Sequence, residues 1–262
     1  MANKYLTRED APFDATIWDM LDTTMTETAR GQLTGRRLLP LEGPHGLGLK
    51  SITLKDARAD DDLTVSQTLP VAYIEERFNL GTRDLANFER EGINLDTQPV
   101  QDAALACARR EDALIFHGGA GIPGLLNTEG AHEMALSDWN EIGSAAADMI
   151  QAVTRLDDAG FHGPYTLALE PALYNVLLRR YPQGNQSEIE HLRTIITDGI
   201  IKAPAMDGGV LLASDSQHAS IVLGQDMTIG FIGPAGDEVE FSISESLTVR
   251  IRHPQALVIL EN

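Results

Sequence analysis

Two segments near the C-terminus, LGQDMTIG (residues 223–230) and EFSISESLTV (residues 240–249), decide how this chain is expected to fold. Both contain alternating apolar and polar residues, the pattern of β-strands with one buried face. Gly233 and Pro234 lie between them and suit a tight turn. The two segments therefore predict a pair of neighbouring strands with a structural role.

Composition bounds the class of protein. The 262 residues are enough for one large domain or two small ones, and 43% of them are hydrophobic. No stretch approaches the ~20 consecutive apolar residues that cross a bilayer, and the N-terminus lacks the apolar core of a secretory signal. The net charge is −19 and the 20 basic residues are scattered, whereas a nucleic-acid surface needs them clustered. Membrane and nucleic acid are therefore not expected as partners.

Helical periodicity predicts several helices. Residues 14–30 form an amphipathic helix in which Ile17, Leu21 and Met25 share a face and Asp14 caps the N-terminus. Residues 99–117 form a long helix that ends in the glycine-rich segment 118–124. A third helix is expected over residues 138–156, with Ser137 as its cap. Its apolar face would carry Trp139, Ile142, Ala146, Met149, Ile150 and Val153.

The predicted strands fall into two kinds. Residues 51–80 alternate and carry a polar tip, the acidic residues 60–62, so they predict a long two-stranded arm. Such an arm has too little core to be stable alone and implies a partner surface. Further strands are expected at 165–169, 210–213, 220–232, 238–251 and 256–260, and short helices at 171–180 and 187–197. This is an α+β pattern rather than regular βαβ alternation.

Motifs that carry chemistry are weak throughout. GAGIPG (residues 119–124) matches the dinucleotide fingerprint, but a helix precedes it where a strand is required, so we expect a turn that ends the helix. Ser214, Asp215 and His218 have the residue types of a catalytic triad but are too close in sequence to converge, so we expect a polar turn. Cys107, the only cysteine, is expected to be a buried apolar residue. A single cysteine cannot form an intrachain disulfide, which fits a reducing cytoplasm.

Metal ligands show no recognised spacing among the seven histidines, and His132 beside Glu133 is the nearest approach to one. We therefore expect no catalytic residues, no metal site and a binding or structural role. A hydrolase that uses the scattered Ser, His and Asp residues remains an alternative.

The segments 223–230 and 240–249 closely resemble the LGQDxSIG…ESFTF signature of the encapsulins, bacterial proteins that assemble into hollow icosahedral shells around enzymes. GRRL (residues 35–38) with EGPHG (residues 42–46), and GPYTL (residues 163–167), resemble the same family in the same order. GIPGLL (residues 121–126) is similar to the family's turn after its long helix. The chain is identified as a member of the linocin type, family 1.

The resemblance implies the α+β fold of tailed-phage major capsid proteins, the Hong Kong 97 type. The implied parts are an N-terminal helix and arm (1–48), an extended loop (49–72), a peripheral domain with a spine helix (73–130), an axial domain (131–219) and return strands (220–262).

It also implies a groove on the inner wall that binds the C-terminal targeting peptide of a cargo enzyme, ferritin-like or of the dye-decolourising peroxidase type. Matched residue by residue, the groove would be lined by Ala29, Leu33, Arg36, Leu38, Leu41 and Ile229. Two positions depart from the family. Pro40 stands where some relatives have an acidic residue, and Ala29 replaces an aromatic residue on the helix.

The loop between the two short helices matches the family's five-fold pore loop, here Tyr181, Pro182, Gln183, Gly184, Asn185, Gln186 and Ser187. These residues are uncharged, and we expect Glu188 and Glu190 behind them to add a negative potential. Some relatives stack a flavin on a Trp where this chain has Arg83, so no cofactor is expected.

The expected partners are other copies of the chain, in a cytoplasmic shell of sixty subunits, and the cargo enzyme. The alternative is a prophage major capsid protein that packages DNA. The encapsulin-like N-terminal helix, the lack of a scaffold-like leader and the net charge of −19 argue against that alternative.

Overall fold

The computed structural model describes residues 4–92, 95–182 and 184–262, which form two compact units. Unit 1 comprises Met1–Leu33, Gly43–Glu111 and Leu223–Leu247, and unit 2 comprises Thr34–Glu42, Asp112–Val222 and Thr248–Asn262. The helix α4 and the strands β9 and β10 contribute residues to both. The five-part division implied by the resemblance is finer, and it stays a prediction.

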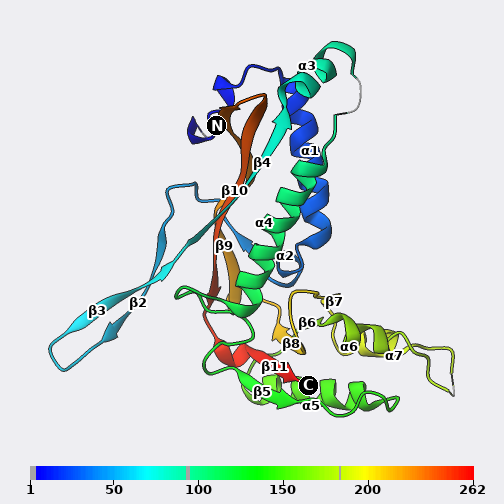
Figure 1. Cartoon of the computed structure of the whole chain (residues 1–262). Helices are drawn as coiled ribbons and strands as arrows, with labels where there is room; N and C mark the ends of the chain where they lie inside the picture. Colours follow the sequence, from blue (N-terminus) through cyan, green and yellow to red (C-terminus); the bar gives the residue numbers. More distant parts are fainter. Residues whose placement is uncertain (1–3, 93–94, 183) are drawn as a thin grey trace. The chain divides into compact units, whose positions relative to one another are not determined.

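Helices and strands both contribute substantially, which confirms the α+β prediction (Figure 1). The α-helices are α1 (Ala15–Gln32), α2 (Gly35–Leu38), α3 (Thr82–Glu91), α4 (Gln98–His117), α5 (Ser144–Asp158), α6 (Pro171–Val176) and α7 (Glu188–Leu192). The 3-10 helices are η1 (Lys4–Leu6), η2 (Arg8–Asp10) and η3 (Pro254–Ala256). The strands are β1 (Leu41–Glu42), β2 (Ser51–Arg58), β3 (Thr64–Pro70), β4 (Ala72–Gly81), β5 (His132–Ala135), β6 (Tyr165–Leu169), β7 (Gly199–Lys202), β8 (Gly209–Ala213), β9 (Ala219–Ala235), β10 (Glu238–Ile251) and β11 (Leu257–Glu261).

The two long helices confirm their predictions. Asp14 caps α1, and its carboxylate accepts a hydrogen bond from the Thr16 amide at 2.8 Å. Ile17 and Leu21 on the predicted face are fully buried. The helix α4 begins one residue before the predicted start and ends at the predicted His117.

The glycine-rich segment after α4 is the predicted turn. Gly118 has a φ of 63°, in the left-handed region, and its amide donates to the Leu114 carbonyl. A Cβ placed on Gly124 would lie 2.3 Å from the Gly118 nitrogen, so only glycine fits this close approach. The glycines of the GAGIPG motif (residues 119–124) therefore have a structural role, which is to end α4 and form the turn after it.

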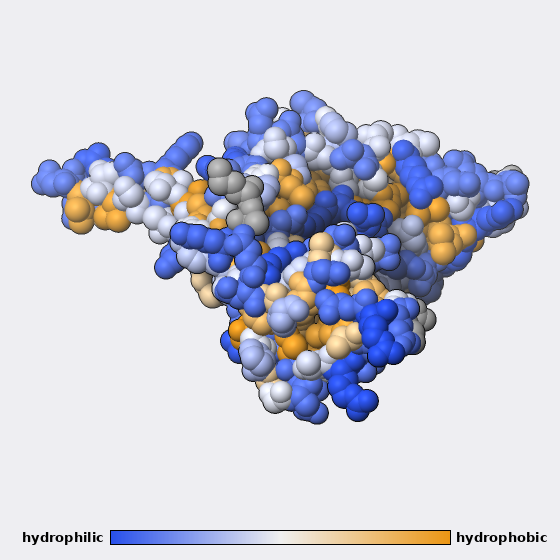
Figure 2. Space-filling model, turned by 90° about the horizontal axis from the view of Figure 1, so that it is seen from above, coloured by the Kyte–Doolittle hydropathy of each residue, from blue (hydrophilic) through white to orange (hydrophobic). Residues whose placement is uncertain are grey.

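In unit 1, β2 and β3 pair only with each other and form a two-stranded arm over residues 51–70 (Figure 1). The prediction that the arm extends to residue 80 was wrong, because β4 pairs with β10 instead. No residue of β2 is buried, and in β3 only Leu69 is. Leu63 and Val65 are about half exposed, and the projecting arm carries hydrophobic as well as hydrophilic surface (Figure 2). The arm therefore has no core of its own. Elsewhere in unit 1, β4 pairs antiparallel with β10.

Unit 2 contains a five-stranded sheet in the order β5-β11-β8-β6-β7. Every residue of β6 and β8 is buried. The sheet is mixed, because β6 pairs antiparallel with β8 but parallel with β7. The strands β5 and β7 were not predicted. With α6 and α7 between them, β6 and β7 make one βαβ crossover within the α+β fold.

The third predicted helix was wrong at its start. The helix α5 begins at Ser144, after Gly143 with a φ of 101°, six residues later than predicted. Ser137 does not cap it. Its amide and hydroxyl instead donate to the Asp148 carboxylate, each at 2.9 Å. The predicted apolar face was also wrong in part, since Ile150 is half exposed.

The two short helices are shorter than predicted. The helix α6 ends at Val176, and α7 spans five residues behind Ser187, which forms a capping box with Glu190. None of the helices among the described residues combines the length and the apolar character needed to span a membrane.

Candidate functional site

Part of the predicted groove is an apolar cluster in unit 1. Ala29 and Leu33, at the end of α1, pack with Ala108 of α4, and the half-buried Met227 of β9 lies against them. Ile229 is fully buried two residues further along β9. Residues two apart on a strand share a face, so Met227 and Ile229 lie on the same side of β9. Met227, which sequence reasoning missed, is the accessible member of this cluster.

The N-terminal segment of unit 1 ties α1 to β9. Arg8 makes two hydrogen bonds to the Asp22 carboxylate of α1, at 2.7 and 2.6 Å, and a third from Nε to the Ile229 carbonyl at 2.7 Å. Its guanidinium also lies 4.4 Å from the Trp18 ring centre. Planar, bidentate pairing of this kind fixes geometry as well as adding energy. Arg8 therefore holds the two elements that carry the apolar cluster.

The other three groove residues, Arg36, Leu38 and Leu41, belong to unit 2. Leu38 is buried, whereas Leu41 is about half exposed. Their segment is fixed by Asp112, whose carboxylate accepts from the Thr34 amide and hydroxyl at 3.0 and 2.6 Å and from the Gly35 amide at 2.9 Å. The structure thus brings Ala29 and Leu33 into one cluster of unit 1, the unit that also contains Ile229, whereas Arg36, Leu38 and Leu41 are residues of unit 2.

The predicted pore loop is a closed turn of unit 2. The Tyr181 amide donates to the Gln186 carbonyl at 3.1 Å, and the Tyr181 hydroxyl contacts His191 Nδ1 at 2.8 Å. Pro182, Gly184 and Asn185 are exposed, as is Gln186, while Gln183 lies outside the described residues. The loop therefore presents polar, uncharged groups to its surroundings.

The expectation about charge behind this loop was wrong for Glu188. That side chain is 1% exposed, pairs with Arg179 at 2.8 Å and accepts from the Gly143 amide at 2.7 Å, so its charge is compensated. Glu190 remains exposed, and the Ser187 backbone and hydroxyl hydrogen bonds lower its pKa. Of the two carboxylates only Glu190 is exposed, and Arg180 and Arg193 lie near enough to lower its pKa further.

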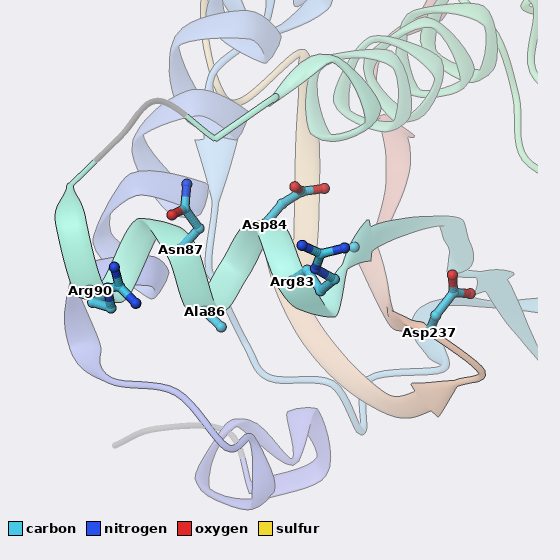
Figure 3. Close-up of a pocket in the computed structure, with 7 residues that line it drawn as sticks. Arg83, Asp84, Ala86, Asn87, Arg90 and Asp237 are labelled. Carbon is cyan, nitrogen blue, oxygen red and sulfur yellow. The ribbon is translucent and has the colours of Figure 1, made fainter.

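At the position of the flavin-stacking Trp, Arg83 lines an open depression of unit 1. Arg83, Ala86, Asn87 and Arg90 come from α3, and Asp237 comes from the turn between β9 and β10 (Figure 3). The residues that line it carry both cationic and anionic groups and no aromatic ring. It therefore lacks a platform on which a flavin ring could stack, and the absence of a flavin stays a prediction.

The residues considered for catalysis do not form a catalytic arrangement. Ser214 Oγ bonds the Thr166 hydroxyl, while Asp215 accepts from the Gln217 amide at 2.7 Å, as expected for a polar turn. Cys107 is fully buried, and burial followed by the nearby Glu245 carboxylate raises its thiol pKa, so the thiol stays protonated. Across the described ranges, no group of three or more His, Cys, Asp or Glu side chains is arranged to hold a metal.

Several known proteins that are similar to this chain are shell proteins. A family model described as "Encapsulating protein for peroxidase" matches residues 3–248. The type 1 encapsulin shell protein EncA of Myxococcus xanthus is 29% identical over 98% of this chain and 96% of its own length. The type 1 encapsulin shell protein of Rhodococcus erythropolis is 32% identical over 97% and 98%. A ferritin-like-encapsulin shell fusion protein of Pyrococcus furiosus is 30% identical over 73% of this chain and 53% of its own length.

The fold of this chain is also similar to solved structures of shell and capsid proteins. The virus-like particle from Pyrococcus furiosus matches with a TM-score of 0.78 and 25% identity over 94% of this chain and 99% of that one. The capsid of Myoviridae phage XM1 matches with a TM-score of 0.63 at 13% identity, over 86% and 88%, which shows the shared capsid fold alone. The chain belongs to the family of encapsulin shell proteins, and its fold is that of tailed-phage capsid proteins.

Proposed function

We propose that this chain is the shell subunit of an encapsulin nanocompartment. Copies assemble into a closed icosahedral shell of sixty subunits in the cytoplasm and enclose a cargo enzyme, either ferritin-like or of the dye-decolourising peroxidase type. The subunit itself is structural and catalyses no reaction.

The observation that carries this proposal is the arm formed by β2 and β3. A two-stranded sheet with a single buried residue is marginal in water unless another surface covers it. Leu63 and Val65 offer apolar area that a second copy can bury. Contacts in which an arm of one copy binds a different surface of the next generate rings and closed shells. Family membership supports the same reading, since the curated relatives are named as shell proteins.

The test is native mass and negative-stain microscopy of the purified protein. The proposal expects uniform thin-walled particles with the mass of sixty subunits and with protein inside when purified from the host. Particles filled with DNA would support the capsid alternative instead. A mass several times larger would overturn the sixty-subunit size while leaving shell formation intact.

For cargo, we propose that an apolar C-terminal peptide binds at Ala29, Leu33 and Ile229, with Arg36, Leu38 and Leu41 as further contacts. Met227 is the residue to change, because it is half-buried against the cluster and tolerates substitution better than the fully buried members. Met227→Glu should leave shells intact but reduce co-purified cargo.

The matched control is Thr228→Glu, which adds the same charge on the opposite face of β9. Equal cargo loading in the two variants would overturn the groove, whereas loss in the first variant alone supports it.

For the pore, we propose that residues 181–187 line the five-fold opening and control access to the cargo. The loop's exposed groups are uncharged, so size and hydrogen bonding set selectivity, with Glu190 as a modest attraction for cations. Shortening residues 183–186 in loaded shells should raise cargo turnover of bulky substrates more than that of small ones. If assembly survives and both rates stay the same, the loop is not the gate.

A further inference from the structure

Two histidines from separate turns of unit 2 lie side by side, and the proposed function uses neither. His218 lies in the turn before β9, and His253 follows the end of β10. Their Nδ1 atoms are 3.4 Å apart, and their ring centres are 5.3 Å apart. The Gln217 carbonyl oxygen accepts a hydrogen bond from His253 Nδ1 at 3.0 Å, so in this structure the His253 ring proton lies on Nδ1. Two imidazole nitrogens and one carbonyl oxygen therefore converge within a few ångströms.

This spacing is that of ligands on one metal ion. Imidazole nitrogens bind Zn²⁺ at about 2.0–2.1 Å, so two of them on a tetrahedral ion are separated by about 3.3–3.4 Å. The separation of 3.4 Å between the two Nδ1 atoms already matches this value. Binding replaces the His253 proton on Nδ1 by the ion and moves the ring to its Nε2-protonated tautomer, so that both Nδ1 lone pairs face the ion.

The surroundings hold both rings in place. The edge of the Phe161 ring packs on His218, with centres 5.0 Å apart at 87°, and Phe161 also contacts His253 at 5.9 Å. The His218 carbonyl accepts from the amides of Arg252 and His253 at 2.7 and 3.2 Å, which ties the two turns together. Ligands that are ordered beforehand lose little conformational entropy on binding.

The charges nearby permit a cation. Burial has the largest effect on the His218 pKa and lowers it, while the nearby Asp215 carboxylate acts in the opposite direction. The Arg252 guanidinium is close, but it forms an ion pair with Glu42 at 2.7 Å, which offsets its charge. The Asp215 carboxylate adds a favourable negative charge to the same turn.

We propose that His218 and His253, with the Gln217 carbonyl oxygen, bind a divalent transition-metal ion, Zn²⁺ or Cu²⁺, with water in the remaining positions. Imidazole favours these ions over Mg²⁺ and Ca²⁺, which prefer oxygen ligands. His253 is exposed, so the ion exchanges with solvent and the site is an accessible one rather than a closed structural one.

The experiment is a Zn²⁺ titration by calorimetry on intact, EDTA-stripped full-length protein at pH 7.4, repeated for His218→Ala and His253→Ala. We expect one strongest site per chain in the wild type and at least tenfold weaker binding in each variant. Thermal unfolding without metal checks that both variants fold. His253→Ala is the safer of the two, because its side chain is the more exposed.

The matched control is His162→Ala, which removes another exposed histidine of unit 2, one that pairs with Asp157. Cu²⁺ electron paramagnetic resonance gives a second readout, with two coupled nitrogens in the wild type and one in each single variant. The same Zn²⁺ affinity in His253→Ala, an equal loss in His162→Ala, or an unchanged nitrogen count would each overturn the site.

Discussion

The five-stranded sheet of unit 2 and the two-stranded arm of unit 1 differ in how far the rest of the chain buries their residues. Every residue of β6 and β8 is buried, whereas β2 has no buried residue and β3 has one. The side chains of the sheet are buried within the subunit itself, whereas most side chains of the arm are not buried by any other part of it. The sheet therefore contributes to the stability of the folded subunit, whereas the arm contributes little to it.

The arm also shows how an exposed pair of strands is kept from binding the wrong partner. Its tip carries Asp60, Asp61 and Asp62, and Arg58 donates from Nε to the Asp60 carbonyl at 3.1 Å. Charged residues at exposed strands oppose uncontrolled edge-to-edge pairing. A buried strand such as β6 needs no such protection.

The strongest test of this contrast is Leu167→Ala at the centre of β6. Leu167 is fully buried, so the variant should lower the free energy of unfolding by about 2–5 kcal/mol, from lost burial and the cavity left behind. Urea unfolding at a fixed subunit concentration measures it, with Leu63→Ala in the arm as the comparison. Similar losses in both variants would mean that the arm is part of the subunit's own core.

A somewhat smaller effect is expected at Asp148 of α5. Its carboxylate accepts from the Ser137 amide and hydroxyl and from Trp139 Nε1 at 2.8 Å, and Asp148→Ala leaves these donors without a partner. The expected loss is about 2–3 kcal/mol. Asp148→Asn, which keeps one acceptor oxygen, should lose less. Urea unfolding followed by tryptophan fluorescence measures both variants, and an Asn variant as unstable as the Ala variant would contradict this account.

Alkaline pH tests the same sheet through Tyr165 of β6. Burial, followed by the hydrogen bond to Asp157, raises the Tyr165 pKa to about 12, whereas tyrosine in an unfolded chain titrates near 10. The folded state holds the proton more tightly, so this stabilisation is complete below pH 10 and is lost as the pH rises through 12. The difference in melting temperature between wild type and Tyr165→Phe should therefore close between pH 10 and 12. A difference that persists to higher pH would show that the phenol proton is not the cause.

The smallest change in subunit stability should come from the arm. Replacing both Leu63 and Val65 by Asp should change the free energy of unfolding of the unassembled subunit by less than about 0.5 kcal/mol, because both side chains are already half exposed. Assembly, measured by size-exclusion chromatography, should nevertheless be lost. The control places the same charges at Thr64 and Ser66 on the other face. If the control blocks assembly equally, charge rather than the apolar face is responsible.

Local signals predicted the long helices, and non-local contacts decided the rest. Asp14 and Pro99 mark the starts of α1 and α4 to within one residue, because a cap and an N-terminal proline act on their own turn. Ser137 gives the same signal, but its partner is Asp148, eleven residues further on, and the helix starts after Gly143 instead. The four-residue strands β5 and β7 depend on pairing with β11 and β6, which no local pattern reveals.

The sites follow the same rule. The resemblance to the encapsulins indicated Ala29 and Leu33, but their neighbour Met227 was overlooked although it lies within residues 223–230, a segment that carries the same resemblance. Glu188 was predicted as a surface charge, but it is buried and pairs with Arg179, a partner that the sequence does not reveal. The proximity of His218 and His253, 35 residues apart, had no signal in the sequence.

The way the two units are threaded has a consequence for synthesis on the ribosome. Each unit is assembled from three separate segments, and unit 1 lacks its last segment until Leu247 has been made. Chains grow from the N-terminus at about 5–20 residues per second, so the arm emerges well before either unit can close. In a polysome, neighbouring nascent chains would expose their arms before they have surfaces to receive them. The proposed contact between arms and neighbouring copies must therefore wait until residue 247 has been made and unit 1 can fold, so the order of the segments separates early exposure of the arm from assembly.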